Sequence, residues 1–406
     1  MKRLAFALTA LLVLALPSLR AAVSGPTLSR DGVTAISDYL DAATRNGDIP
    51  PLVGAVTNRF SEVYSVSTYA ARDRGTRPGD IIFNIASMTK PITSVAVMQL
   101  VEAGKLHLDD DASQYLPNLA KLQVLDRVDL KAGTWTTRPR RGAITIKELL
   151  THTSGVGYSF SDPRLALVAQ KTKLADGDLP LVADPGTRWT YSASTKLLGD
   201  IIAKVTGEPL DQYLEAHVLQ PLGMRDTAYA VAPAKRSRVA PIYHREQGRW
   251  VAAPVPASLP VTIRGDGGLY STASDYAHFI RMMLNGGTLN GTRLLRADTV
   301  REMTRNQIGS LVVPLQPTAN PAVSKPFPLG AGTAKWGLGF LIQTASEPGG
   351  PSVGSYSWAG IYNTEFWIDP QKEIGGILLM QTLPFYDDKA VEALRGFERR
   401  VYAGLQ

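Results

Sequence analysis

The sequence has no cysteine among its 406 residues. This absence excludes disulfide bonds, a thiol nucleophile and lipid attachment through an N-terminal cysteine. Histidine is also scarce, and the spacing of the five histidines matches no metal-ligand pattern. These are His107, His152, His217, His244 and His278. We therefore expect neither a metal nor another cofactor.

Long charged blocks, low-complexity tracts and internal repeats are also missing. The basic cluster of Arg138, Arg140 and Arg141 has no interleaved aromatic residues, so we expect a solvated loop there and no nucleic-acid partner. Hydrophobic residues make up 44% of the chain and charged residues 19%. Such a composition supplies a large folded core, and a globular enzyme is the starting expectation.

The N-terminus has the layout of a secretory signal peptide. Lys2 and Arg3 precede an apolar run over 4–16, which is followed by Pro17 and small residues ending at Ala21. The run is too short to span a bilayer, and no later segment is apolar enough to do so. We predict a signal peptide over 1–21 and a periplasmic or secreted mature protein, with a buried N-terminal helix as the alternative. The sequence does not indicate the oligomeric state.

Hydrophobic periodicity predicts strands near both ends of the chain and helices between them. Strands are expected over 52–58, 63–70, 337–344, 355–361, 363–368 and 374–381. Helices are expected over 31–45, 87–103, 146–150, 195–205, 209–217, 273–284 and 389–402. This order predicts an α+β fold, in which terminal strands from both ends form one antiparallel sheet flanked by helices. We expect one domain over 22–406, with an α/β part at about 22–105 and 286–406 and a mostly helical part at about 106–285.

The first candidate for chemistry is Ser87-Met88-Thr89-Lys90 at the start of the predicted helix 87–103. Residues three apart share a helical face, so the Ser87 and Lys90 side chains can meet. A neighbouring base activates a serine hydroxyl, and lysine serves if its pKa falls from about 10.4 to about 7, which requires about 4 kcal/mol of differential stabilisation. The backbone N–H groups of the helix start favour an oxyanion at the same place. Taken alone, however, a Ser-x-x-Lys pattern is weak evidence.

Two further segments could complete such a site. Tyr191 lies in a predicted loop at the entrance of helix 195–205, where its phenol could exchange protons with Lys90. The two would titrate together, so the sequence does not decide which is the main base. Trp358-Ala359-Gly360 falls on a predicted strand whose small residues allow a substrate to approach the backbone. Alone, each segment is also compatible with a packing role.

Together these segments resemble the serine β-lactamase and penicillin-binding-protein superfamily, and within it the family VIII carboxylesterases and class C β-lactamases. The resemblance spans about 31–402. Besides Ser-Met-Thr-Lys, the matching stretches are ITIKELLTHTSG at 144–155, DPGTRW at 184–189, GGLYST at 267–272 and FWIDP at 366–370. The resemblance implies the β-lactamase/transpeptidase-like fold.

The resemblance also implies roles for individual residues. Ser87 would be the acylated nucleophile, and Lys90 and Tyr191 would be its proton-transfer partners. The backbone N–H groups of Ser87 and Ile361 would form the oxyanion hole beside the 358–360 strand. His152 lies in a matching stretch but is expected to fix a loop.

Two departures separate this chain from class C β-lactamases. Tyr191-Ser192-Ala193 stands where they have Tyr-x-Asn, and Trp358-Ala359-Gly360 stands where they have Lys-Thr-Gly. The changes remove an amide and a cation that could bind a lactam antibiotic. They favour hydrolysis of a small-molecule short-chain ester through an acyl-serine, with acyl transfer to alcohols as a further outcome. A β-lactamase or a D-amino-acid-releasing peptidase is the alternative enzyme, and a non-catalytic cell-wall-binding homologue is the alternative of another class.

A second serine pattern must be dismissed. Gly350-Pro351-Ser352-Val353-Gly354 fits the Gly-x-Ser-x-Gly pattern of α/β-hydrolases, in which the triad histidine follows the serine. All five histidines of this chain precede Ser352, and a strand is predicted after it. We therefore expect Ser352 to be structural.

Overall fold

A computed structural model describes residues 25–69, 77–328 and 330–406. The predicted signal peptide over 1–21 lies outside the described residues and stays a prediction. No helix in the described part of the chain is both long and apolar enough to cross a membrane.

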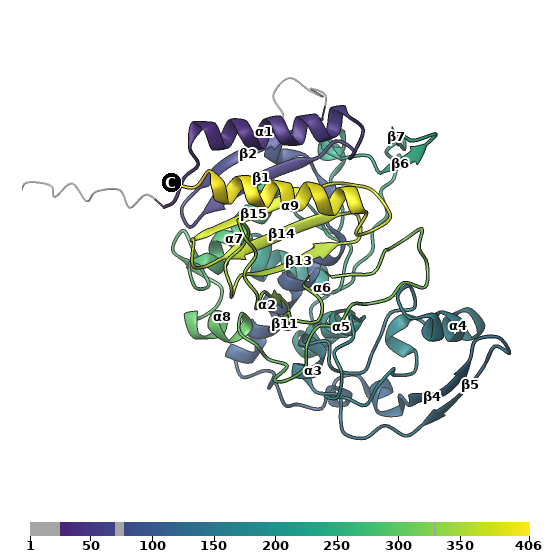
Figure 1. Ribbon diagram of the computed structural model, residues 1–406. Helices are drawn as coiled ribbons and strands as arrows, with labels where there is room; N and C mark the ends of the chain where they lie inside the picture. Colours follow the sequence, from purple (N-terminus) through teal and green to yellow (C-terminus); the bar gives the residue numbers. More distant parts are fainter. Residues whose placement is uncertain (1–24, 70–76, 329) are drawn as a thin grey trace, which may run out of the picture.

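A seven-stranded antiparallel sheet is the centre of the molecule, and its strands come from both ends of the chain (Figure 1). Its order is β11-β12-β13-β14-β15-β1-β2. The strands are β1 Val53–Asn58, β2 Glu62–Ser67, β11 Lys335–Trp336, β12 Leu341–Ile342, β13 Tyr356–Gly360, β14 Thr364–Asp369 and β15 Ile374–Leu379. The two ends of the chain meet where β1 pairs with β15, in a register that sets Val53 opposite Leu379. The predicted antiparallel sheet with strands from both termini is confirmed.

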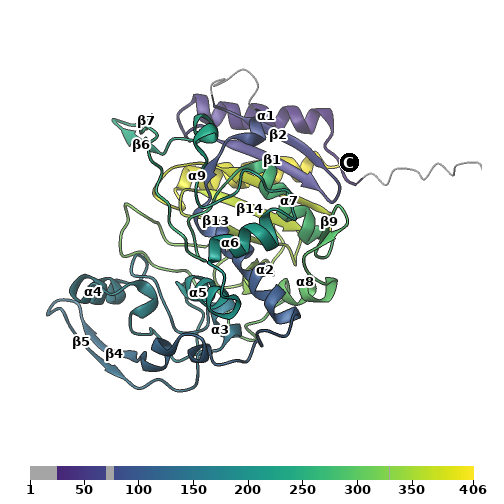
Figure 2. The same cartoon turned by 180° about the vertical axis from the view of Figure 1, so that it is seen from behind.

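Helices cover both faces of this sheet. The first and last helices, α1 Arg30–Arg45 and α9 Asp388–Ala403, lie side by side on one face (Figure 1). Buried side chains from both helices, including Leu40 and Phe397, pack there against sheet residues such as Leu378. On the opposite face α7 Ala273–Leu284 packs against β1 and β15, in front of the sheet in Figure 2. The sheet is therefore the middle layer between two helical layers.

The predicted nucleophile, Ser87, lies in a short turn directly before a buried helix. α2 Thr89–Glu102 follows a 3₁₀ turn at Ala86–Met88. Pro91 sits in the first helical turn, where its missing N–H costs no intrahelical bond. All but three of the fourteen side chains of α2 are buried, so this helix is a central part of the core.

The middle of the chain contains the four predicted helices, together with helices and hairpins that the sequence analysis did not predict. The predicted helices are α3 Ile146–Leu150, α5 Ser194–Thr206, α6 Leu210–Leu214 with a π-helical turn Glu215–Leu219, and α7. The helices that were not predicted are α4 Pro163–Thr172 and α8 Ala297–Met303. The hairpins are β4 Val124–Asp129 with β5 Thr134–Arg138, and β6 Tyr243–Glu246 with β7 Arg249–Ala252. Short pairs β3 Phe83–Asn84 with β8 Tyr270–Ser271, and β9 Thr288–Leu289 with β10 Thr292–Arg293, complete the fold. The boundaries expected at 105 and 285 stay predictions, although α7 lies on the sheet.

One predicted strand is wrong. The segment 337–344 is expected to be one continuous strand, but its first four residues form the turn between β11 and β12, and only Leu341 and Ile342 are in a strand. Gly339 has φ of 100° in this turn, a backbone conformation that interrupts an extended strand. The apolar residues of the segment are buried, which is why they gave a strand-like signal.

Candidate active site

Ser87 lies at the wall of a cavity of about 330 Å³ between the sheet and the helical part. The preceding residue, Ala86, has φ of 43°, a left-handed conformation that is unusual for a residue other than glycine. It is fixed by Asn84, whose side-chain oxygen accepts a hydrogen bond from the Ala86 amide at 3.0 Å. Because the Gln381 side chain in turn bonds to both backbone groups of Asn84, the segment that follows β15 holds the nucleophile segment in place.

Lys90 lies directly behind Ser87, as the spacing of the motif predicted. Its Nζ donates a hydrogen bond to Ser87 Oγ at 3.0 Å, and the residue is only 1% exposed. Burial lowers the pKa of Lys90 to about 7, while the charge of Asp266 acts in the opposite direction. A substantial fraction of Lys90 is thus neutral at pH 7 and can accept the Ser87 proton.

Tyr191 borders the same cavity just before α5. Lys90 Nζ lies 4.8 Å from the centre of its ring. Burial raises the pKa of Tyr191, and a hydrogen bond with the Ser87 hydroxyl opposes this only in part. Tyr191 is therefore a neutral phenol at pH 7, which makes Lys90 the better proton acceptor and Tyr191 a proton donor.

The segment 358–360 borders the cavity through Ala359 alone, with Ile361 beside it. Trp358 is 3% exposed and packs behind Tyr191, with ring centres 4.9 Å apart. Gly360 faces the chain that leads to Ser87, because a Cβ atom there would lie 2.3 Å from the Ile85 carbonyl oxygen. Trp358 and Gly360 are thus not among the residues that line this cavity, whereas Ile361 is. The substrate contacts expected of Trp358, Ala359 and Gly360, and the oxyanion role expected of the Ile361 amide, stay predictions.

Three residues that the sequence analysis missed complete the site. Asp266 accepts a hydrogen bond from Lys90 Nζ on its backbone oxygen at 2.8 Å. Its carboxylate binds the Arg264 guanidinium, through Nε and Nη2 at 2.8 Å each, and the Tyr158 hydroxyl. All three border the cavity. GGLYST at 267–272 was recognised as a matching stretch, but its spacing gave no reason to single out the preceding Arg-Gly-Asp.

His152 is buried behind Tyr191, with ring centres 5.2 Å apart. Its Nδ1 is 2.8 Å from Ser192 Oγ, a hydrogen bond that ties the 144–155 stretch to the loop carrying Tyr191. Burial, reinforced by the charge of Lys90, holds the pKa of His152 well below its usual value. These contacts fit the loop-fixing role expected of it.

Ser352 does not share the surroundings of Ser87. It lies in the loop before β13, where its backbone N–H donates a hydrogen bond to Asp369 at 2.9 Å. Within the described ranges, no group of three His, Cys, Asp or Glu side chains is placed to hold a metal ion.

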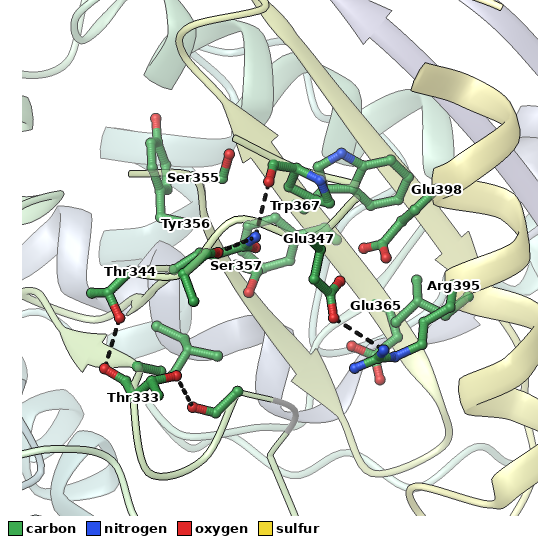
Figure 3. A pocket seen from close by; sticks show the side chains of 18 of the residues that line it. Thr333, Thr344, Glu347, Ser355, Tyr356, Ser357, Glu365, Trp367, Arg395 and Glu398 are labelled. Atoms are coloured by element: carbon green, nitrogen blue, oxygen red, sulfur yellow. Dashed lines mark hydrogen bonds and ion pairs between the residues drawn. The ribbon is translucent and has the colours of Figure 1, made fainter. Parts of the chain in front are cut away.

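A second cavity of about 290 Å³ lies between β13, β14 and α9 (Figure 3). Glu365 and Glu398 line it beside Arg395, which pairs with Glu347 at 3.0 Å. Burial raises the pKa of Glu398 to about 8, and the charge of Glu347 adds to the effect. Neither serine lining this cavity, Ser355 or Ser357, has a lysine or histidine partner among its lining residues, so it lacks the chemistry of the first.

This burial predicts that Glu398→Gln stabilises the protein in alkaline buffer. An acid whose pKa is raised on folding contributes stability that is lost as pH rises from about 4.5, its unfolded value, to about 8. Thermal melts should show Tm raised by about 2 °C or more at pH 8.5 and little changed at pH 5. Glu392→Gln, on an exposed position of the same helix, is the matched control. An equal change at both pH values would contradict the assignment.

Three comparisons with known proteins agree with this geometry. The family model described as Beta-lactamase matches residues 36–399. Esterase EstB of Burkholderia gladioli is 30% identical over 379 residues, covering 82% of this chain and 86% of that protein. Monacolin J acid methylbutanoyltransferase of Aspergillus terreus is 29% identical over 348 residues, covering 79% and 82%. The solved structure of simvastatin synthase from Aspergillus terreus has a TM-score of 0.78 at 26% identity, and covers 92% of this chain and 99% of that one.

Proposed function

Because the chain belongs to the beta-lactamase family, we propose that it is a serine hydrolase that cleaves short-chain carboxylic esters through an acyl-serine intermediate. The observation that carries the proposal is the 3.0 Å contact between Ser87 Oγ and a buried Lys90 whose pKa is about 7. A nucleophile and a base within hydrogen-bond reach at a cavity wall are the first requirement of covalent catalysis. The similarity to an esterase supports the choice of substrate class.

The reaction would proceed in two halves. Neutral Lys90 takes the proton of Ser87 as Oγ attacks the ester carbonyl, and the Ser87 and Ile361 amides stabilise the oxyanion. Tyr191 donates a proton to the departing alkoxide and is reprotonated through Lys90. Water then attacks the acyl-serine along the reverse path and releases the acid. An alcohol in place of water would give acyl transfer, which the similarity to a methylbutanoyltransferase favours as a second activity.

Esters should be preferred over β-lactams by about 100-fold or more in kcat/KM. A lactam antibiotic brings a carboxylate and an amide that need partners, and each buried polar group left alone costs about 1–3 kcal/mol. Arg264 is the cation at the cavity wall, but Asp266 already occupies two of its donors. Ala193 is fully buried and apolar where an amide would be useful to a lactam.

The measurement compares p-nitrophenyl esters of increasing acyl length with nitrocefin and a D-alanyl peptide. Ala193→Asn should lower the ester-to-lactam ratio, with a thermal melt to show that the buried substitution is tolerated. Trp358→Lys is a poorer test, because it would disturb the packing behind Tyr191. A wild-type protein that hydrolyses nitrocefin as efficiently as p-nitrophenyl butyrate would make it a β-lactamase.

A further inference from the structure

The loop beside Lys90 is fixed at three successive carbonyl groups. Tyr229 donates a hydrogen bond to the Arg264 carbonyl and Thr93 donates one to the Gly265 carbonyl, each at 2.7 Å. Lys90 itself bonds to the carbonyl of Asp266. Gly265 also packs so closely on α5 that a Cβ atom would lie 2.3 Å from the Thr195 carbonyl oxygen. The loop is therefore held by both α2 and α5.

The side chain of Asp266 is held as firmly as its backbone. The residue is 4% exposed, and its carboxylate accepts two hydrogen bonds from Arg264 and one from Tyr158. A buried carboxylate with three charge-assisted or hydroxyl donors keeps its charge. Accordingly, Lys90 and Arg264 hold the pKa of Asp266 below its usual value in spite of burial.

We propose that Arg264, Asp266 and Tyr158 form a positioning unit, which aims the lone pair of Lys90 Nζ at Ser87 and balances the charge around that amine. A neutral amine has two N–H bonds and one lone pair. The Asp266 carbonyl takes one N–H, and the rings of Tyr191 and Tyr158, at 4.8 and 5.4 Å, flank the nitrogen. The charged amine donates to Ser87 Oγ at 3.0 Å, and once it is neutral its lone pair can accept the hydroxyl proton of Ser87 across the same contact. This inference rests on the proposed function and deepens it.

The two charges of the unit act on Lys90 in opposite directions. The carboxylate of Asp266 raises the pKa of Lys90, and the Arg264 guanidinium lowers it. The other titratable groups nearby are the phenols of Tyr158 and Tyr191 and the imidazole of His152, all neutral near pH 7. Asp176, which also lines the cavity, acts on Arg264. Since the two phenols and the imidazole stay uncharged near pH 7, the Arg264 and Asp266 charges decide how the base responds to pH.

Substitution of each charge should therefore move the acid limb of the kcat/KM profile in opposite directions. Asp266→Asn removes the negative charge, so the limb moves from about pH 7 to lower pH. Arg264→Met removes the positive charge, so the limb moves to higher pH. We expect about half a pH unit or more in each case, and a double variant near the wild-type limb. The assay uses p-nitrophenyl butyrate, and the pH dependence of fluorophosphonate inactivation gives a second readout.

Three controls separate this effect from general damage. Arg59→Met breaks an ion pair with Glu373 at 2.8 Å outside the cavity lining, and should leave the limb in place. Asp266→Glu and Arg264→Lys keep the charges, so they supply folded comparisons if a thermal melt shows that a neutral variant is unstable. In both, the acid limb should stay within about 0.3 of a pH unit of the wild-type position, while kcat falls. Limbs that stay fixed in both neutral variants, or move the same way, overturn the positioning unit. A wild-type protein with neither esterase activity nor labelling at Ser87 overturns the proposed function instead.

Discussion

Ser87→Ala is expected to lower kcat for ester hydrolysis by at least about 10⁴-fold and to leave the fold intact. Without Oγ the covalent route has no nucleophile, and removal of such a group from a serine hydrolase costs nearly the whole catalytic effect. The side chain is partly exposed at the cavity, and the substitution removes only its hydrogen bonds with Lys90 and Tyr191, so Tm should change little. The measurement is kcat on p-nitrophenyl butyrate together with a thermal melt.

Labelling by a fluorophosphonate identifies the nucleophile directly. Mass spectrometry of the labelled wild type should place the adduct on Ser87, and Ser87→Ala should remain unlabelled. Ser352→Ala is the matched control and should keep full activity, because Ser352 lies in the loop before β13. An adduct on Ser352, together with an active Ser87→Ala protein, would contradict the assignment.

Lys90→Met and Tyr191→Phe are each expected to lower kcat by about 10²-fold or more, with a double variant far less impaired than the product of the two losses. Both residues serve one proton path, so once one of them is lost, removal of the other lowers kcat little further. Methionine matches the length of the lysine stem, which limits the cavity that a shorter residue would leave at this buried position.

The pH profile gives a second measure of the same pair. Wild-type activity should rise with pH through about 7, because only neutral Lys90 accepts the proton. In Lys90→Met this limb should vanish, whereas in Tyr191→Phe it should persist at reduced height. Strictly additive free-energy losses in the double variant would count against a shared path, and a limb surviving in Lys90→Met would assign it to another group.

The Ser87–Lys90 pair was predictable because its information is local. Ser87 and Lys90 are three residues apart at the start of a helix, and Pro91 fits only in its first turn. These local features together place the two side chains on one face. The sheet was predictable for a similar reason, since strands such as β1 and β15 are short, largely apolar segments, and they are buried at every position. Tyr191 and Ile361 required the resemblance to a family to connect them with Ser87.

The remaining features depend on contacts that no local pattern records. Asp266 is 176 positions from Lys90, and meets it through a backbone oxygen, a group that every residue carries. Trp358 is expected at the cavity because it lies on a strand that borders the cavity. Neighbouring side chains of a strand point to opposite faces, however, so the indole of Trp358 packs against Tyr191 and Ala359 lines the cavity. The hairpin of β4 and β5 contains few buried residues, which is why its periodicity was weak.

The pairing of β1 with β15 joins residues more than 300 positions apart, such as Val53 and Leu379. Closing so long a loop is entropically unfavourable before the flanking contacts form, which slows folding. During synthesis, β1 of the β1–β2 hairpin can pair with its other neighbour, β15, only after almost the whole chain has been made. An unfinished chain thus exposes an unpaired strand edge. A deletion that removes only the last strands and helix would leave the N-terminal hairpin without its sheet partner, and we expect such a chain to aggregate.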